Sequence, residues 1–290
     1  MNFHLHRKLK ARFRSSLGAA GRFLPLRLKK GLARRSPKWS YLLLNDAPWI
    51  LEDYLGDLRI QVSATNEIER VLISGRYEPE LITTIRQWVK PGHHALDIGA
   101  NVGAITLALA KQVGPSGTVS SFEPGPPFFE RLTANVKLNP AFHKTVQLHR
   151  LGLSDQKGEL LWGEDQVFPG NARLGQGGTT QVPVTRLDEF FKTPPARLDF
   201  MKIDVEGMEL KVLVGAQKLI AQFNPLIVFE TFMPYEMIES ETLSLQTITW
   251  LEKLGYAMYH ADGHLPPRPA RYPKLSLNTL AIPPHHPIRN

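Results

Sequence analysis

The sequence predicts an α/β protein built on a doubly wound, mostly parallel seven-stranded sheet of the Rossmann-like kind. From residue 78 onward, short apolar runs alternate with segments of helical spacing. One stretch, "HALDIGANVGAITLALA" over 94–110, runs from an apolar strand through an aspartate and a glycine loop into an apolar helix. With 290 residues, 42% of them apolar, the chain suffices for one large domain or two small ones.

The elements follow one another in a regular order. Apolar residues at helical spacing predict helices in five segments, and buried or alternating apolar runs predict strands in seven. The helices are expected at 78–89, 103–113, 126–139, 207–220 and 243–255. The strands are expected at 94–98, 117–123, 145–154, 198–205, 225–230, 256–260 and 275–283. A hairpin is expected around "GELLW" and "TQVPV", inside a polar, glycine-rich region.

Three parts are expected along the chain: a basic arm over 1–45, a small N-terminal β subdomain over 46–77, and the main domain over 78–290. In the β subdomain, "LRIQVSA" and "ERVLISG" indicate two strands on either side of the turn-prone "TNE".

The charge is concentrated in the arm. The formal net charge is +8, but residues 1–45 hold twelve of the 35 basic residues and no acid, which leaves 23 bases against all 27 acids and a net charge of −4. A basic arm with interspersed apolar residues favours peripheral contact with an anionic membrane. A solvated leader or an Arg-rich transit peptide are the alternatives.

Composition excludes several functions. The chain has no cysteine, so disulfides, thiolate metal sites and a cysteine nucleophile are excluded, and a reducing compartment is favoured. It has no apolar run long enough to span a bilayer. We therefore expect a cytoplasmic protein, peripheral to the membrane if the arm binds lipid.

The first two strand ends carry a ligand-binding pattern. Asp97 ends one predicted strand, Gly99, Asn101 and Gly103 form the turn into a helix, and Glu123 ends the next strand. Small residues let a ligand approach the backbone, and an acid at the second strand end suits ribose hydroxyls. A dinucleotide would place its pyrophosphate near the Asp97 carboxylate, whereas the sulfonium and ammonium of S-adenosylmethionine would be attracted to it.

A second group of acids is expected at the same edge. Asp204 and Glu206 follow the strand "FMKIDV", and Glu230 ends "PLIVFE". Since the carboxyl ends of parallel strands share one edge, these three acids should converge there. An acid near a helix start, such as Glu209, is equally explained as a cap.

The chain resembles the FkbM family of S-adenosylmethionine-dependent methyltransferases. The resemblance rests on "YEPEL", "LDIGANVGAITLALA", "FEPGPPFFERLTANVKLN", "LGLSDQKGE" and above all "KIDVEGMELKVLVGA". It covers about 77–230, with weaker agreement as far as "NTLAIP". One departure is Gly125, which follows Glu123 and Pro124 where a polar residue is usual.

The resemblance implies a class I methyltransferase sheet with a reversed last strand. It also implies methyl transfer to a hydroxyl of a sugar, glycan or polyketide-like acceptor. The residues that it assigns to the donor are Asp97, Gly99, Ala100, Asn101 and Gly103 for the methionine end, Glu123 for the ribose, and Ser154 and Asp155 near the adenine. Asp204 and Glu206 would face the site of transfer.

An alcohol is a poor nucleophile at neutral pH, so a base is expected. Asp204, Glu206 or Glu230 is the hypothesis; His93, His94, His260 and His264 are the rivals. No spacing specifies a metal, although a hard cation held by acids is compatible with the sequence.

Two other functions stay open at this point: an NAD-type oxidoreductase on a related sheet, and an anionic-surface-binding module that uses the arm. Nucleic acid is not expected as a partner, because the net charge beyond residue 45 is negative and no Asn/Asp-Pro-Pro-aromatic motif occurs.

Overall fold

A computed structural model provides the structure of the protein. It describes residues 31, 48–63, 67–164, 172–174, 178–231, 238–265, 267–270 and 277–289. Apart from residue 31, the basic arm predicted over 1–45 lies outside the described residues. The chain divides into two compact units. Of the described residues, those up to Tyr77 belong to the first unit and those from Glu78 onward to the second. Among the described helices, none combines the length and the apolar character needed to cross a bilayer.

The first unit holds a β-hairpin and a short helix. Strand β1 (Trp49–Tyr54) pairs antiparallel with β2 (Leu58–Val62), and helix α4 (Glu67–Ile73) follows. The prediction of a strand over 69–75 is therefore wrong. Its buried positions, Glu69, Leu72 and Ile73, have helical spacing, and β2 finds its partner on the N-terminal side instead.

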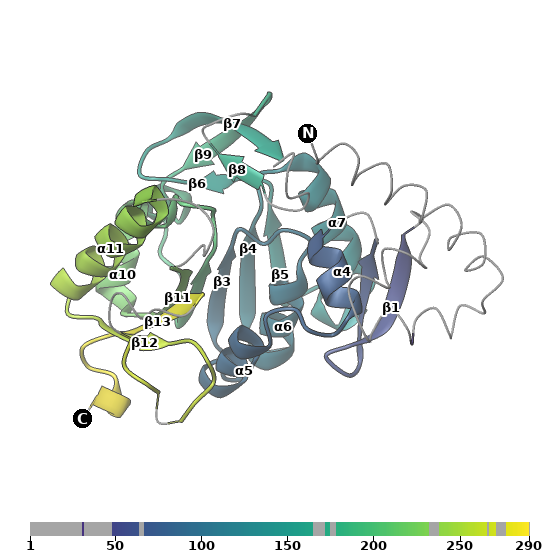
Figure 1. Cartoon of the computed structure of the whole chain (residues 1–290), viewed down its shortest axis with the longest axis horizontal. Coiled ribbons are helices and arrows are strands. Elements are labelled where there is room, and N and C mark those ends of the chain that lie inside the picture. The colour runs from purple at the N-terminus through teal and green to yellow at the C-terminus, as the bar shows by residue number, and fades with distance from the viewer. Residues whose placement is uncertain are drawn as a thin grey trace, which may run out of the picture. The chain divides into compact units, whose positions relative to one another are not determined.

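The second unit is built on the predicted seven-stranded sheet, in the order β12-β13-β11-β10-β3-β4-β5 (Figure 1). Strands β3, β4, β5, β10 and β11 run parallel, and β13 lies antiparallel to both neighbours, so the reversed last strand is confirmed. The strands are β3 (His94–Ile98), β4 (Thr118–Phe122), β5 (Val146–His149), β10 (Phe200–Ile203), β11 (Leu226–Glu230), β12 (Ala257–His260) and β13 (Asn278–Ile282).

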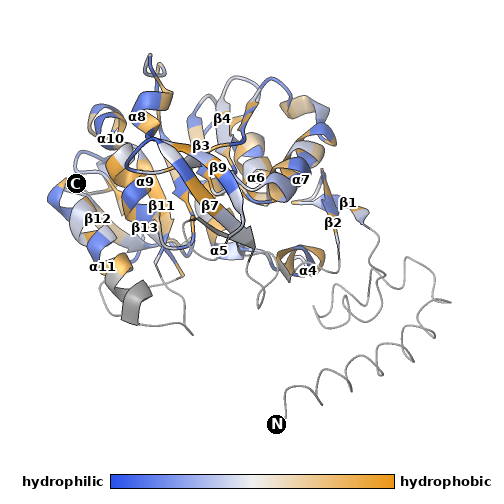
Figure 2. Ribbon diagram, turned by 90° about the horizontal axis from the view of Figure 1, so that it is seen from above, coloured by the Kyte–Doolittle hydropathy of each residue, from blue (hydrophilic) through white to orange (hydrophobic). Residues whose placement is uncertain are grey.

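Helices cover both faces of this sheet. Figure 2 shows α6 and α7 on one side of β3 and β4, and α8, α9 and α10 on the other. The helices are α5 (Pro79–Trp88), α6 (Ala104–Val113), α7 (Pro126–Lys137), α8 (Leu187–Phe190), α9 (Glu209–Gly215), α10 (Gln217–Phe223) and α11 (Ile238–Lys253), with short 3₁₀ turns at Pro140–Phe142 and Pro287–Arg289. Side chains alternate along each strand, so Asp97 faces Thr106 of α6 whereas Ile98 faces the core under α9 and α10.

A four-stranded sheet follows β5 directly, in the order β6-β9-β7-β8. Figure 1 draws it above β4 and β5. Its strands are β6 (Gly152–Leu153), β7 (Gly158–Glu164), β8 (Ala172–Leu174) and β9 (Thr180–Thr185). Strands β7 and β9 pair antiparallel, which confirms the predicted hairpin region around "GELLW" and "TQVPV".

Candidate functional site

The carboxyl ends of the parallel strands bring together the acids that the sequence singled out. Asp97 lies one residue before the end of β3, Glu123 follows β4, Asp204 follows β10, and Glu230 ends β11. In a doubly wound sheet this edge is where ligands bind.

The loop between β3 and α6 is a tight turn. Gly99 has φ +79°, and a Cβ atom there would fall inside van der Waals contact with the backbone carbonyl oxygen of Asp204. Gly103 has φ +91°, and its Cβ would lie 2.6 Å from Cδ1 of Leu132. Asn101, at φ 49°, also adopts the left-handed conformation. Only this sequence of small residues lets the loop follow the edge so closely.

Asp97 is fully enclosed by protein. Its side chain is 0% exposed, and Oδ2 accepts a 2.5 Å hydrogen bond from the Thr106 hydroxyl. Lys202 is its cross-strand neighbour on β10, and the Lys202 Nζ atom lies 3.5 Å from Asp97 Oδ1. Asp97 therefore anchors the start of α6 and pairs with a buried cation.

Lys202 is the centre of this network. Its side chain is 4% exposed, and Nζ donates to the Gly99 carbonyl oxygen at 2.9 Å and lies 3.2 Å from Asp204 Oδ2. Burial opposes its charged form, but Asp204 and Asp97 together outweigh burial and raise the pKa of Lys202 above its ordinary value. Lys202 was not predicted as a site residue, although a lysine inside an apolar strand was the signal.

Replacing Lys202 with methionine is expected to lower the free energy of unfolding by about 3–5 kcal/mol, because it leaves two acids without their cation. Urea denaturation measures this loss. Lys211→Met, at an exposed position on α9, should stay within about 0.5 kcal/mol of wild type. Adding Asp97→Asn to Lys202→Met should restore part of the stability. A Lys202→Met protein as stable as Lys211→Met would contradict the network.

Glu123 holds the glycine loop and the start of the next helix together. Its carboxylate accepts the backbone N–H of Asn101 at 2.9 Å and of Gly125 at 2.8 Å, and burial raises its pKa to about 7. Each oxygen accepts one of these bonds and retains a further acceptor position, as ribose hydroxyls require. The unusual Gly125 also has a structural reason: a Cβ there would run into the ring of Trp162 on β7.

The raised pKa of Glu123 predicts a pH-dependent stability. The folded protein keeps a proton on Glu123 to a higher pH than the unfolded chain does. The contribution of this proton to the free energy of unfolding is therefore complete below about pH 4.5 and is lost as the pH rises through about 7. The wild-type minus Glu123→Gln difference in unfolding free energy should therefore fall by about 2–3 kcal/mol between pH 5 and pH 8. Urea midpoints of both proteins across this range measure it; a constant difference would contradict the assignment.

Three acids converge beyond β10 and β11. Asp204, Glu206 and Glu230 each place one carboxylate oxygen within 4.8 Å of the others, a grouping that could hold a hard cation. Burial, followed by repulsion from Asp204 and Glu206, raises the pKa of Glu230 well above its ordinary value. Glu209 begins α9, and its Oε1 accepts the N–H groups of Val205 and Gly207, so it holds the preceding turn; the helix itself has no side-chain cap hydrogen bond.

Ser154 and Asp155 lie just after β6. Ser154 is 2% exposed, its N–H donates to the Thr185 carbonyl oxygen, and its hydroxyl donates to Asp155 at 3.0 Å. Arg186 donates to the Asp155 carbonyl oxygen. The two residues thus form a compact turn beyond the end of β5; a role near the adenine stays a prediction.

The histidines proposed as rival bases are distributed over both edges of the sheet. His94 begins β3, and its ring nitrogens lie 3.1 Å from the Arg197 carbonyl oxygen and 3.1 Å from the Ser120 hydroxyl. His93 precedes it, so both lie at the amino edge, away from the acids. His260 ends β12 at the carboxyl edge, two strands away from Glu230, and His264 follows in the next loop.

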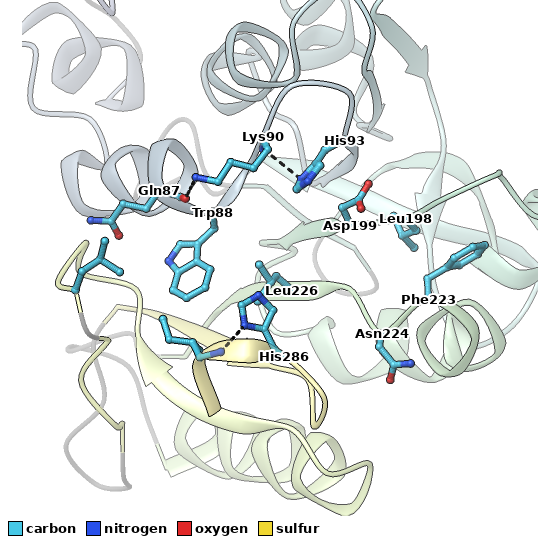
Figure 3. A pocket seen from close by; sticks show the side chains of 12 residues that line it. Gln87, Trp88, Lys90, His93, Leu198, Asp199, Phe223, Asn224, Leu226 and His286 are labelled. Carbon is cyan, nitrogen blue, oxygen red and sulfur yellow. Dashed lines mark hydrogen bonds between the residues drawn. The ribbon is translucent and has the colours of Figure 1, made fainter. Parts of the chain in front are cut away.

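A cavity of about 460 Å³ lies at the amino edge (Figure 3). Trp88, Leu226 and Phe223 supply apolar walls, and His93 and His286 reach its rim. The ring of His286 lies 5.4 Å from that of Trp88, so this part of the C-terminal segment packs against the end of α5. The cavity opens at the start of the strands and is separate from the acidic edge.

The fold defines a doubly wound α/β protein, a class in which ligands bind at the carboxyl ends of the parallel strands, where the acids of this chain gather. The family described as "Methyltransferase FkbM domain" matches residues 97–258, and the chain belongs to this family. The resemblance that the sequence motifs indicated is thereby confirmed.

Two curated proteins illustrate the relationship. "Methyltransferase 1" of Beauveria bassiana is 30% identical over 144 residues, which are 41% of this chain and 57% of that protein. "Hexuronic acid methyltransferase AglP" of Haloferax volcanii is 27% identical over 172 residues, 59% of this chain and 69% of that protein. The chain thus spans little more than half of the first relative's length.

Among solved structures, the methyltransferase FkbM from Methylobacillus flagellatus aligns with 73% of this chain and 54% of its own, at 15% identity and a TM-score of 0.45.

Proposed function

We propose that the protein is an S-adenosylmethionine-dependent methyltransferase that acts on a hydroxyl of a sugar, glycan or polyketide-like acceptor. The observation that carries the proposal is the edge itself: a glycine loop that only small residues can form, a ribose-suited acid in Glu123, and three further acids. The family of the chain supports methyl transfer, and the name of the Haloferax volcanii relative is consistent with a sugar acceptor.

The residues present fit the donor. Gly99 and Gly103 let the loop pack closely against Asp204 and Leu132 at this edge, and Glu123 offers acceptor positions beside the loop. When bound, the donor supplies an activated methyl group on a positively charged sulfur, which a negatively charged edge favours. NAD fits less well, because its pyrophosphate would approach the carboxylates of this edge.

Asp204 is the group that we assign as general base. Its N–H donates to the Ile98 carbonyl oxygen at 3.0 Å, so it lies directly beside the glycine loop. Burial and repulsion from Asp204 and Glu206 raise the pKa of Glu230 and disfavour its charged form, and Glu206 belongs to a left-handed turn one step further out. The hydroxyl oxygen of the acceptor would be held in line with the methyl group of the donor, and Asp204 would take up the proton of that hydroxyl.

Isotope transfer tests this function. The full chain is incubated with donor carrying a labelled methyl group and with fractionated cell extract or a panel of uronic acids, oligosaccharides and polyketide alcohols. Mass spectrometry should find a product that gains one labelled methyl group on oxygen. A labelled amine or nucleic acid would contradict the acceptor class, and donor that binds without any transfer would contradict the activity.

A further inference from the structure

Asp97 and the Gly99 carbonyl oxygen are the groups of the glycine loop suited to receive a ligand's cation, and the Lys202 ammonium already lies beside both. Lys202 Nζ donates to the Gly99 oxygen at 2.9 Å and lies 3.5 Å from Asp97 Oδ1, while Thr106 takes the other oxygen. Asp97 is 0% exposed. The α-ammonium group at the methionine end of the donor therefore needs another counter-charge.

Glu78 reaches the same edge from the start of α5. Its Oε2 atom accepts a 2.8 Å hydrogen bond from Nδ2 of Asn278, and Asn278 begins β13 directly opposite Glu230. Asp204 and Lys202 both act on its charge. Glu78 thus lies beside the acids of β10 and β11, although it stands 19 positions before Asp97 in the chain.

The Glu78 carboxylate is not used to stabilise the helix that it precedes. Glu78 is the N-cap residue of α5, yet its side chain makes no capping hydrogen bond. Among the described residues its hydrogen-bond partner is the neutral amide of Asn278, and no cation lies within ion-pair distance. Its backbone is left-handed, at φ 42° and ψ 52°, which costs free energy for a residue with a Cβ and is typical of functional positions.

We infer that Glu78, rather than Asp97, binds the α-ammonium group of the donor's methionine end. Three observations support this role: the half-buried carboxylate has a free oxygen, Asn278 orients it, and it lies at the edge that holds the glycine loop. Burial and repulsion from Asp204 also raise the pKa of Glu78, so an incoming cation relieves an unfavourable charge. The inference rests on the proposed function, because it assigns part of the donor site.

Comparing the affinities of two ligands distinguishes the contact with the ammonium group from the other contacts of the donor site. S-adenosylhomocysteine carries the ammonium group and no sulfonium, and 5′-methylthioadenosine lacks the amino-acid portion altogether. Calorimetry should show that Glu78→Gln weakens S-adenosylhomocysteine about 10- to 100-fold and leaves methylthioadenosine within twofold of wild type. Glu80→Gln, an exposed acid in the first turn of the same helix, should leave both affinities unchanged.

Glu78→Asp keeps the negative charge but shortens the side chain by one methylene group. Its affinity for S-adenosylhomocysteine should fall about 3- to 10-fold, while its affinity for methylthioadenosine should not change. It also tests the inference if the glutamine variant does not fold. Equal losses for both ligands, or no loss for either, would overturn the role of Glu78. A wild-type protein that binds neither ligand would instead overturn the proposed function.

Discussion

Replacing Asp204 with asparagine is expected to slow methyl transfer by about 10²- to 10⁴-fold, while donor affinity stays within about threefold of wild type. Asparagine keeps the shape and can still face Lys202, but it cannot accept the hydroxyl proton. The loss should therefore fall on kcat, measured by label transfer under saturating donor, with binding followed by calorimetry.

Matched variants make the Asp204 result specific. Glu252→Gln, on the exposed surface of α11, should keep wild-type turnover. Glu230→Gln should lose less turnover than Asp204→Asn, because burial and repulsion from Asp204 and Glu206 already disfavour the charged form of Glu230. Normal turnover in Asp204→Asn would contradict its role as base. Activity that disappears with EDTA and returns with Mg²⁺ would assign the cluster of Asp204, Glu206 and Glu230 to a cation instead.

Gly99→Ala is expected to abolish donor binding, with an affinity loss above about 100-fold, and to lower the free energy of unfolding by about 2–4 kcal/mol. The added methyl group would collide with the backbone of Asp204, which cannot move without displacing β10. The positive φ of Gly99 adds strain of about 1 kcal/mol. Calorimetry with S-adenosylhomocysteine and urea denaturation measure the two effects.

Gly114→Ala is the control that separates the steric collision of an added methyl group from the strain of a positive φ angle. It also has a positive φ, of +64°, but a Cβ there would have open space around it. Gly114→Ala should therefore cost about 1–3 kcal/mol of unfolding free energy through strain alone and leave donor binding unchanged. If Gly99→Ala behaved like Gly114→Ala, the close approach of the loop to Asp204 would not matter for the site.

The main fold follows from patterns that are local in the sequence. An apolar run predicts strand 94–98, and a glycine turn followed by apolar residues at helical spacing predicts helix 104–113. The order of the strands in the sheet then brings the ends of these elements to one edge. Helix α4 was mistaken for a strand because "ERVLISG" is short, and a short apolar run fits either period. The break between α9 and α10 at Ala216 was likewise not predicted.

Residues of the site could be predicted from the sequence only where an acidic side chain stands at the end of a predicted strand. The structure places Asp97, Glu123, Asp204 and Glu230 at the predicted edge, and their roles there stay predictions. The pairing of Lys202 with Asp97 depends on the register between β3 and β10, and the Lys202 contact with Gly99 joins residues 103 apart in the chain. Glu78 was visible in the motif "YEPEL", but its place beside β13 depends on tertiary packing with Asn278.

The central claim is that the negatively charged carboxyl edge binds the methyl donor. A crystal of the full chain grown with S-adenosylhomocysteine tests it most directly. We predict density along residues 99–103, with the ribose hydroxyls beside Glu123 and the ammonium group beside Glu78. An edge left empty while the ligand fills the cavity lined by Trp88 and His286, or an edge that binds NAD instead, would contradict the claim.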